Sequence, residues 1–158
     1  IVWELSELME DGRPSTVNKR YTNSLGDKAT LRKDLENWRG RAFTPEELQA
    51  FSLGALLDKC CQLNVVHKKG VRNPEKVYAN ISSIMPLGKG QQVDERQNDL
   101  VDFGICDLGT PEFEKIWPWV QNIIKESEEG RRFFSDPANV SADSAPFSDN
   151  EKEDTIPF

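Results

Sequence analysis

Four short segments alternate apolar and polar residues, and a stretch with helical spacing separates the second from the third. The alternating segments are residues 1–5, 17–21, 60–67 and 77–82. A period of two places every second side chain on the same side of a strand, so each segment predicts a β-strand. The order strand, strand, helical stretch, strand, strand therefore favours a mainly β fold with a helical insertion.

The insertion contains two predicted helices. In the first, three apolar residues recur at i, i+4 and i+7 and form one face: Leu31, Leu35 and Trp38. Asp27 is a suitable N-cap for this helix, and Gly40 is a suitable C-terminal stop. The second helix is expected to begin at Thr44-Pro45-Glu46-Glu47, a capping box with proline at the first helical position, and to bury Leu48 and Phe51.

The chain after the fourth strand is less regular. Residues 100–105 are expected to form a short closing strand. Residues 107–134 predict an amphipathic helix that is capped at Thr110 and that Pro118 can kink. The apolar stripe of this helix is Phe113, Ile116, Trp117, Val120 and Ile124. Residues 135–158 are rich in Ser, Asp, Ala and Pro, a composition that predicts a disordered acidic tail.

Charge is distributed unevenly along the 158 residues. The formal net charge is -7, with 14 lysines and arginines against 11 acidic residues in residues 1–93, and 6 against 16 in residues 94–158. A basic body with an acidic arm indicates contact with nucleic acid, because the basic part attracts phosphate. A solvated surface with sorted charges is the alternative.

Several functional classes find little support in the sequence. Three cysteines, two of them adjacent, form neither a disulfide framework nor the paired spacing of a zinc knuckle, and there is a single histidine. Glycine-rich phosphate loops and Ser-His-Asp sets are absent. No apolar run reaches the roughly 18 residues of a membrane span, and no signal peptide is present. We therefore expect a cytoplasmic, non-enzymatic protein without a metal, a cofactor or a membrane anchor.

The acidic tail ends in an apolar tip. Asp154-Thr155-Ile156-Pro157-Phe158 resembles the C-terminal tip of bacterial and phage single-stranded-DNA-binding proteins, which close on an acidic run followed by Ile-Pro-Phe. This resemblance implies a docking peptide that recruits replication or recombination proteins. The predicted partner contacts are Asp149, Glu151, Glu153, Asp154, Ile156, Pro157 and Phe158. A solubilising tail is the alternative, although it leaves the apolar tip unexplained.

The body carries a second resemblance. Residues 20–25, 31–44, 64–67 and 78–81 are similar to a family of small phage replication proteins described as single-stranded-DNA-binding. This resemblance implies an OB-type β-barrel over residues 1–106 and DNA binding. The four predicted strands match strands two to five of such a barrel, so we expect the first strand to precede Ile1. The nucleic-acid groove of an OB barrel lies over strands two and three, beside the loops joining strands one to two and four to five.

Single-strand binding requires cations along the phosphates and flat rings on which bases stack. The predicted nucleic-acid contacts are Lys19, Arg20, Tyr21, Arg39, Arg41, Lys68, Lys69, Arg72 and Tyr78. Tyr21 and Tyr78 are the candidate stacking platforms. Arg39 and Arg41 either contact phosphate or meet the carbonyls at the end of a helix. Trp3 and Trp38 share faces with apolar neighbours, so we expect both in the core.

The expected function is therefore that of a phage protein that coats single-stranded DNA during replication or recombination. The alternative is an OB-type adaptor or recombination mediator that binds protein and has no affinity of its own for single-stranded DNA. The sequence leaves open whether copies of the chain associate.

Overall fold

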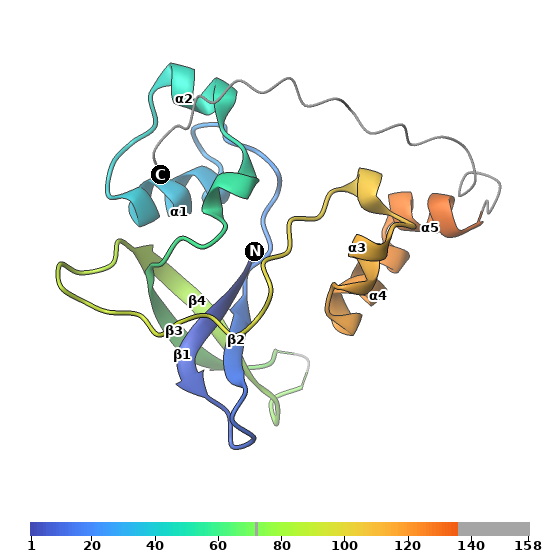
Figure 1. Cartoon of the computed structure of the whole chain (residues 1–158), viewed down its shortest axis with the longest axis horizontal. Helices are drawn as coiled ribbons and strands as arrows, with labels where there is room; N and C mark the ends of the chain where they lie inside the picture. The colour runs from blue at the N-terminus through green and yellow to red at the C-terminus, as the bar shows by residue number, and fades with distance from the viewer. Residues whose placement is uncertain (72, 136–158) are drawn as a thin grey trace. The chain divides into compact units, whose positions relative to one another are not determined.

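The computed structural model describes residues 1–71 and 73–135 (Figure 1). This part of the chain forms two compact units that divide between Asp99 and Leu100. The boundary expected from the sequence follows residue 106. Arg72 and residues 136–158, which include every predicted partner contact, lie outside the described residues.

Three of the four predicted strands are confirmed with shifted ends. The strand predicted over residues 17–21 spans residues 14–18 instead, so Lys19, Arg20 and Tyr21 lie beyond its end. β1 (Val2–Leu8) pairs antiparallel with β2 (Pro14–Asn18), and β3 (Gln62–Lys69) pairs antiparallel with β4 (Val77–Met85). The described residues thus form two two-stranded sheets and no closed barrel.

The expected closing strand over residues 100–105 is wrong. Residues 100–104 form no strand, and the short 3-10 helix η2 (Ile105–Asp107) follows them. The carboxylate of Asp107 accepts a hydrogen bond from the backbone N–H of Gly104 at 2.7 Å. This local bond favours a turn over an extended strand, because it satisfies a backbone donor within four residues.

The two helices of the insertion are confirmed. α1 (Thr30–Arg39) buries its predicted apolar face and ends at Gly40, whose positive φ of 72° suits glycine. The predicted cap is wrong, because Ala29 occupies the N-cap position and Asp27 instead pairs with Arg32 at 2.5 Å. α2 (Pro45–Ala50) begins with the predicted capping box, and the 3-10 helix η1 (Leu53–Leu56) follows it.

One apolar cluster holds the first unit together. It consists of Trp3, Val17, Leu31, Leu35, Trp38, Phe43, Leu56, Ile81 and Ile84. The rings of Trp3 and Trp38 lie 5.9 Å apart, so the prediction that both are core residues is confirmed. Leu48 and Phe51 of the second predicted helix are half-buried against this cluster. The core thus joins both sheets to α1 and to the segments that follow it.

A β-bulge interrupts the regular alternation of β4. Asn64 pairs with Ser83 and Val65 pairs with Ile81, so Ser82 is an extra residue with no residue of β3 directly opposite it, and its hydroxyl donates to the carbonyl of Asn64 at 3.0 Å. Because of this insertion, Ile81 and Ile84 both face the core although they are three residues apart. The half of the hairpin beyond the bulge is exposed, with Val77 58% accessible.

The second unit consists of short helices in place of the single helix expected over residues 107–134. They are α3 (Pro111–Glu114), α4 (Pro118–Glu126) and α5 (Glu128–Ser135). Pro118 begins α4 rather than kinking a longer helix, because its ring cannot donate a backbone hydrogen bond. Leu108, Phe113 and Ile116 form the buried cluster of this unit.

The turn between α4 and α5 requires a glycine. The hydroxyl of Ser127 accepts a hydrogen bond from Gly130 N at 3.0 Å and donates to the carbonyl of Ile124 at 2.6 Å. A Cβ on Gly130 would lie 1.9 Å from that carbonyl oxygen. The two helices therefore approach each other at a point where only glycine fits. In the described part of the chain, no helix is both long enough and apolar enough to cross a bilayer.

Candidate nucleic-acid interface

The structure describes eight of the nine predicted nucleic-acid contacts, since Arg72 lies outside it. These residues do not form one surface. Lys19 and Tyr21 lie beside α1, and Arg39 and Arg41 surround the start of α2. The other predicted contacts on β3 and β4 are Lys68, Lys69 and Tyr78, and all three are exposed.

Lys19 and Tyr21 are held by a buried carboxylate. Asp34 is 8% exposed, and its Oδ2 accepts hydrogen bonds from Lys19 Nζ at 2.6 Å and from the Tyr21 hydroxyl at 2.8 Å. Burial, together with the bond to Asp34, raises the pKa of Tyr21 well above its ordinary value. Lys19 Nζ also lies 5.4 Å from the centroid of the Tyr21 ring. These contacts tie the segment after β2 to α1, which is a structural role. Arg20, between the two, is exposed.

Arg39 and Arg41 share one acidic partner. Both guanidinium groups donate to Glu47, with a closest distance of 2.6 Å in each case. The Arg39 side chain is only 2% exposed, and its guanidinium lies 4.3 Å from the centroid of the Phe43 ring. Hydrogen bonds from Arg41, Arg39 and the backbone of Thr44 hold the pKa of Glu47 far below its ordinary range. The arginines therefore stabilise the connection between α1 and α2.

The outer half of the β3–β4 hairpin is different. Lys68 lies directly opposite Tyr78, and Lys69 lies opposite Val77. Residues opposite each other in an antiparallel pair project to the same side, and neighbours along a strand project to opposite sides. Lys68 and Tyr78 therefore share one side of the hairpin, and Lys69 lies on the other side with Val77.

We call the first side the Tyr78 face. It consists of Val66, Lys68, Gly70, Lys76, Tyr78 and Asn80. Tyr78 is 51% exposed, and Lys68 and Lys76 are exposed on either side of it. Within residues 1–71 and 73–135, neither lysine has an ion-pair partner. The face thus presents an accessible aromatic ring between two uncompensated cations.

Lys76 was not among the predicted contacts, although a signal for it exists in the sequence. It stands two residues before Tyr78, a spacing that places both side chains on one side of an extended segment. The hydrogen bond from Gly70 N to Lys76 O, 2.8 Å, continues the ladder of β3 and β4 to this position. Lys76 therefore belongs to the same surface as Lys68.

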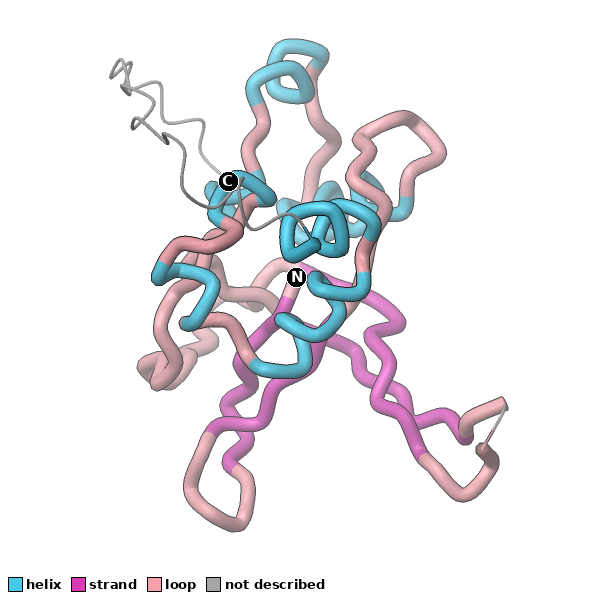
Figure 2. Tube along the Cα trace, turned by 90° about the vertical axis from the view of Figure 1, so that its right-hand side faces the viewer, coloured by secondary structure: helices cyan, strands magenta, loops and turns pink. Residues whose placement is uncertain are grey.

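The loop that closes the hairpin is internally bonded. Lys76 N donates to Asn73 O at 3.1 Å, and Glu75 N donates to Asn73 Oδ1 at 3.2 Å. Asparagine followed by proline is a combination that favours such a turn. Figure 2 shows that this hairpin and the β1–β2 hairpin diverge, so the loop of β3–β4 stands clear of its neighbour.

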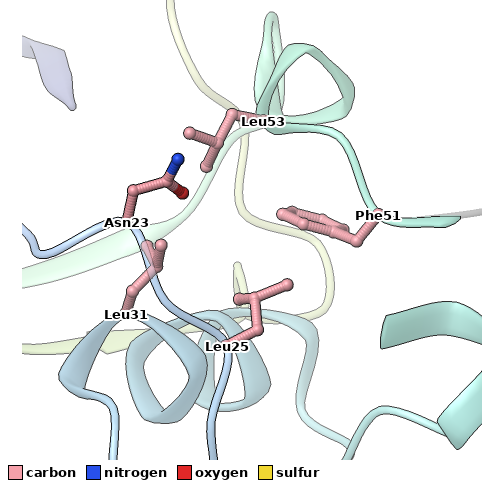
Figure 3. Close-up of a pocket in the computed structure, with 5 residues that line it drawn as sticks. All are labelled: Asn23, Leu25, Leu31, Phe51 and Leu53. Atoms are coloured by element: carbon pink, nitrogen blue, oxygen red, sulfur yellow. The ribbon is translucent and has the colours of Figure 1, made fainter. Parts of the chain in front are cut away.

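A separate pocket lies beside α1. The pocket has a volume of about 200 Å³, which is smaller than the usual range for small-molecule sites (Figure 3). Its lining residues are Asn23, Leu25, Leu31, Phe51 and Leu53. None of them carries a charge, so the pocket offers no cation that would attract phosphate. In the ranges that the structure describes, no group of three or more His, Cys, Asp or Glu residues could hold a metal ion.

Comparison with known proteins gives no relative. No family model, no curated protein and no solved structure matches this chain.

Proposed function

We propose that this protein binds single-stranded DNA through the Tyr78 face of the β3–β4 hairpin. The observation that carries the proposal is the exposed Tyr78 ring between Lys68 and Lys76, with no acidic partner for either lysine among the described residues. Stacking on an aromatic ring tolerates every base, because every base has a flat face. Lysines on both sides of the ring attract the phosphates that flank a stacked base.

The surface charge of the hairpin supports this assignment despite the net charge of -7. Lys68, Lys69 and Lys76 are all exposed near the end of the hairpin, and Glu75 is the one acidic residue in the described part of residues 66–80. Exposed cations that are not neutralised by the protein attract a polyanion from solution. In contrast, Lys19, Arg39 and Arg41 already have carboxylate partners.

The arrangement of the strands is compatible with an OB-type barrel that is open in this structure. β2 lies against β4, although no ladder of hydrogen bonds joins them. This contact brings together the strands that correspond to the third and fifth of an OB barrel. In this proposal the β3–β4 loop corresponds to the loop between strands four and five, which contributes to oligonucleotide binding in that fold.

The acidic tail has a separate role in the proposal. Ile156, Pro157 and Phe158 dock into an apolar pocket of a replication or recombination protein, and the acidic residues before them steer the encounter. The support for this role comes from the sequence alone, since the tail lies outside the described residues.

The test is a fluorescence-anisotropy titration of a labelled oligothymidine at several salt concentrations, with a duplex of the same length for comparison. We expect the single strand to bind more tightly than the duplex, because paired bases cannot stack on Tyr78. The affinity is expected to fall as salt rises, because each phosphate contact releases a counterion. Absence of binding to the single strand would refute the proposal.

Two variants assign the binding to the hairpin. Tyr78→Ala removes the stacking ring and is expected to weaken binding by about 5- to 150-fold, the range for one stacked base. Lys68→Ala combined with Lys76→Ala is expected to lower the slope of log K against log salt by about 1.4, or about 0.7 for each phosphate contact. Lys89→Ala is the matched control, because Lys89 is an exposed lysine of the same unit that is not part of β3, β4 or the loop between them.

An adaptor that binds protein is the second candidate. The observation that favours it is exposed apolar surface at both hairpin ends, where Leu8 is 57% and Val77 58% accessible. Weak binding to the single strand without steep salt dependence would support the adaptor, because phosphate neutralisation is what produces the slope.

A further inference from the structure

Gly70 lies against the ring of Tyr78. The two residues are diagonal neighbours on the same side of the hairpin, since Lys68 is opposite Tyr78 and Gly70 N bonds to Lys76 O. A Cβ on Gly70 would lie 2.7 Å from Tyr78 Cε2 and 2.7 Å from the carbonyl oxygen of Asn73. Contacts this short do not occur at real Cβ atoms, so the ring leans into space that any other residue would fill.

This contact restricts where the ring lies. Tyr78 remains 51% exposed, so one part of its surface meets the backbone at Gly70 while another part faces solvent. A ring held in one place loses less conformational entropy when a ligand stacks on it. An aromatic side chain that covers a glycine across a hairpin also stabilises the sheet, so the contact has a purely structural explanation as well.

We propose that Gly70 is the positioning residue for the base-stacking site of this protein. The missing side chain of Gly70 lets Tyr78 settle between Lys68 and Lys76, where an unpaired base stacks while the lysines contact the neighbouring phosphates. The ligand class is single-stranded nucleic acid read by its bases' flat faces, without preference for sequence. This inference rests on the proposed single-strand binding and adds a residue that does not touch DNA itself.

The decisive experiment removes the bases but keeps the phosphates. Affinities of the full chain are measured for oligothymidine and for an abasic oligonucleotide of the same length. The ratio of the two affinities is the base dependence. We expect Tyr78→Ala to lower this ratio by about 5- to 150-fold. Gly70→Ala is expected to lower it to the same extent, because the displaced ring no longer lies where a base can stack.

Three variants separate positioning from general damage. Gly26→Ala is the matched control, because a Cβ there meets nothing closer than 3.5 Å. Tyr78→Phe keeps the ring and is expected to retain the base dependence. Lys68→Ala is expected to weaken binding to both oligonucleotides equally. In the Gly70→Ala background, adding Tyr78→Ala is expected to change the base dependence no further.

A DNA-free measurement checks the contact itself. In the nuclear magnetic resonance spectrum, the Gly70 α-protons are expected to be displaced by the ring current of Tyr78. The displacement is expected to persist in Tyr78→Phe and to disappear in Tyr78→Leu.

The outcomes distinguish the two proposals. Binding that keeps its full base dependence in Gly70→Ala refutes the positioning role and leaves single-strand binding intact. A lower affinity of Gly70→Ala for both oligonucleotides, with an unchanged ratio, also refutes it and assigns the effect to loop distortion through Asn73. Absence of any single-strand binding by the wild-type chain refutes both proposals.

Discussion

Replacing Asp34 is expected to destabilise the first unit by about 3 kcal/mol. The carboxylate accepts one hydrogen bond from the Lys19 ammonium and one from the Tyr21 hydroxyl. A hydrogen bond that involves a charged group contributes about 1.5–3 kcal/mol. We take the lower end for each, because the Lys19 side chain is 23% exposed and water screens the pair. Asp34→Ala removes both bonds, whereas Tyr21→Phe removes one and is expected to cost about 1.5 kcal/mol.

The assay is urea unfolding followed by tryptophan fluorescence. Trp117 and Trp119 are replaced by phenylalanine in every variant, so that Trp3 and Trp38 in the core of the first unit give the signal. Asp94→Ala is the matched control, because Asp94 is exposed and its carboxylate has no hydrogen bond or ion pair to the described residues.

Two results would contradict this reasoning. A loss below about 1 kcal/mol for Asp34→Ala would show that the buried carboxylate does not hold the segment after β2. A loss of single-strand affinity in Tyr21→Leu as large as that in Tyr78→Ala, measured where the variant is folded, would show that Tyr21 is part of the binding surface.

Three further outcomes are expected. The pKa of Glu47 lies below its ordinary value of 4.5, so the stability that its ionised carboxylate contributes is fully present above pH 4.5 and is lost as the pH falls below it. When the free energy of unfolding is measured against pH, Glu47→Gln should therefore lose less stability in acid than the wild type. Gly130→Ala is expected to destabilise the second unit by about 3 kcal/mol, because the new Cβ clashes with backbone, whereas Gly26→Ala changes thermal stability little. Deleting residues 149–158 should leave single-strand affinity equal or higher and abolish partner pull-down, and unchanged pull-down would exclude the docking role of the tail.

Signals that act over a few residues predicted the elements well. The capping box of residues 44–47, the stop at Gly40 and the face of α1 depend on neighbours within one or two turns, and the structure contains all three. The alternating segments likewise located three of the strands, whereas the second strand begins three residues before the segment that predicted it. Such features can be predicted because their partners are close in the sequence.

Partners that fold closure brings together could not be predicted in this way. The sequence predicts Lys19 and Tyr21 as DNA contacts, but in the structure both bond to Asp34, which lies on α1. Arg39 and Arg41 had two expected roles, and Glu47 gave them a third. A count of basic residues cannot distinguish a cation that has a carboxylate partner from one that has none. The predicted set of DNA contacts therefore includes residues that do not belong to the Tyr78 face.

The bulge at Ser82 has a mechanical consequence. It separates a half of β4 that is anchored by Ile81 and Ile84 from a half that projects into solvent, and a bulge bends and twists the strand that contains it. The direction in which the outer half projects therefore depends on a single inserted residue. Deleting Ser82 would restore regular alternation and keep Ile81 and Ile84 on the inner side. The core contacts would therefore be retained, while the outer half of the hairpin would project in a different direction. Ile81 and Ile84 thus anchor the hairpin in the core, and Ser82 sets the direction of its outer half.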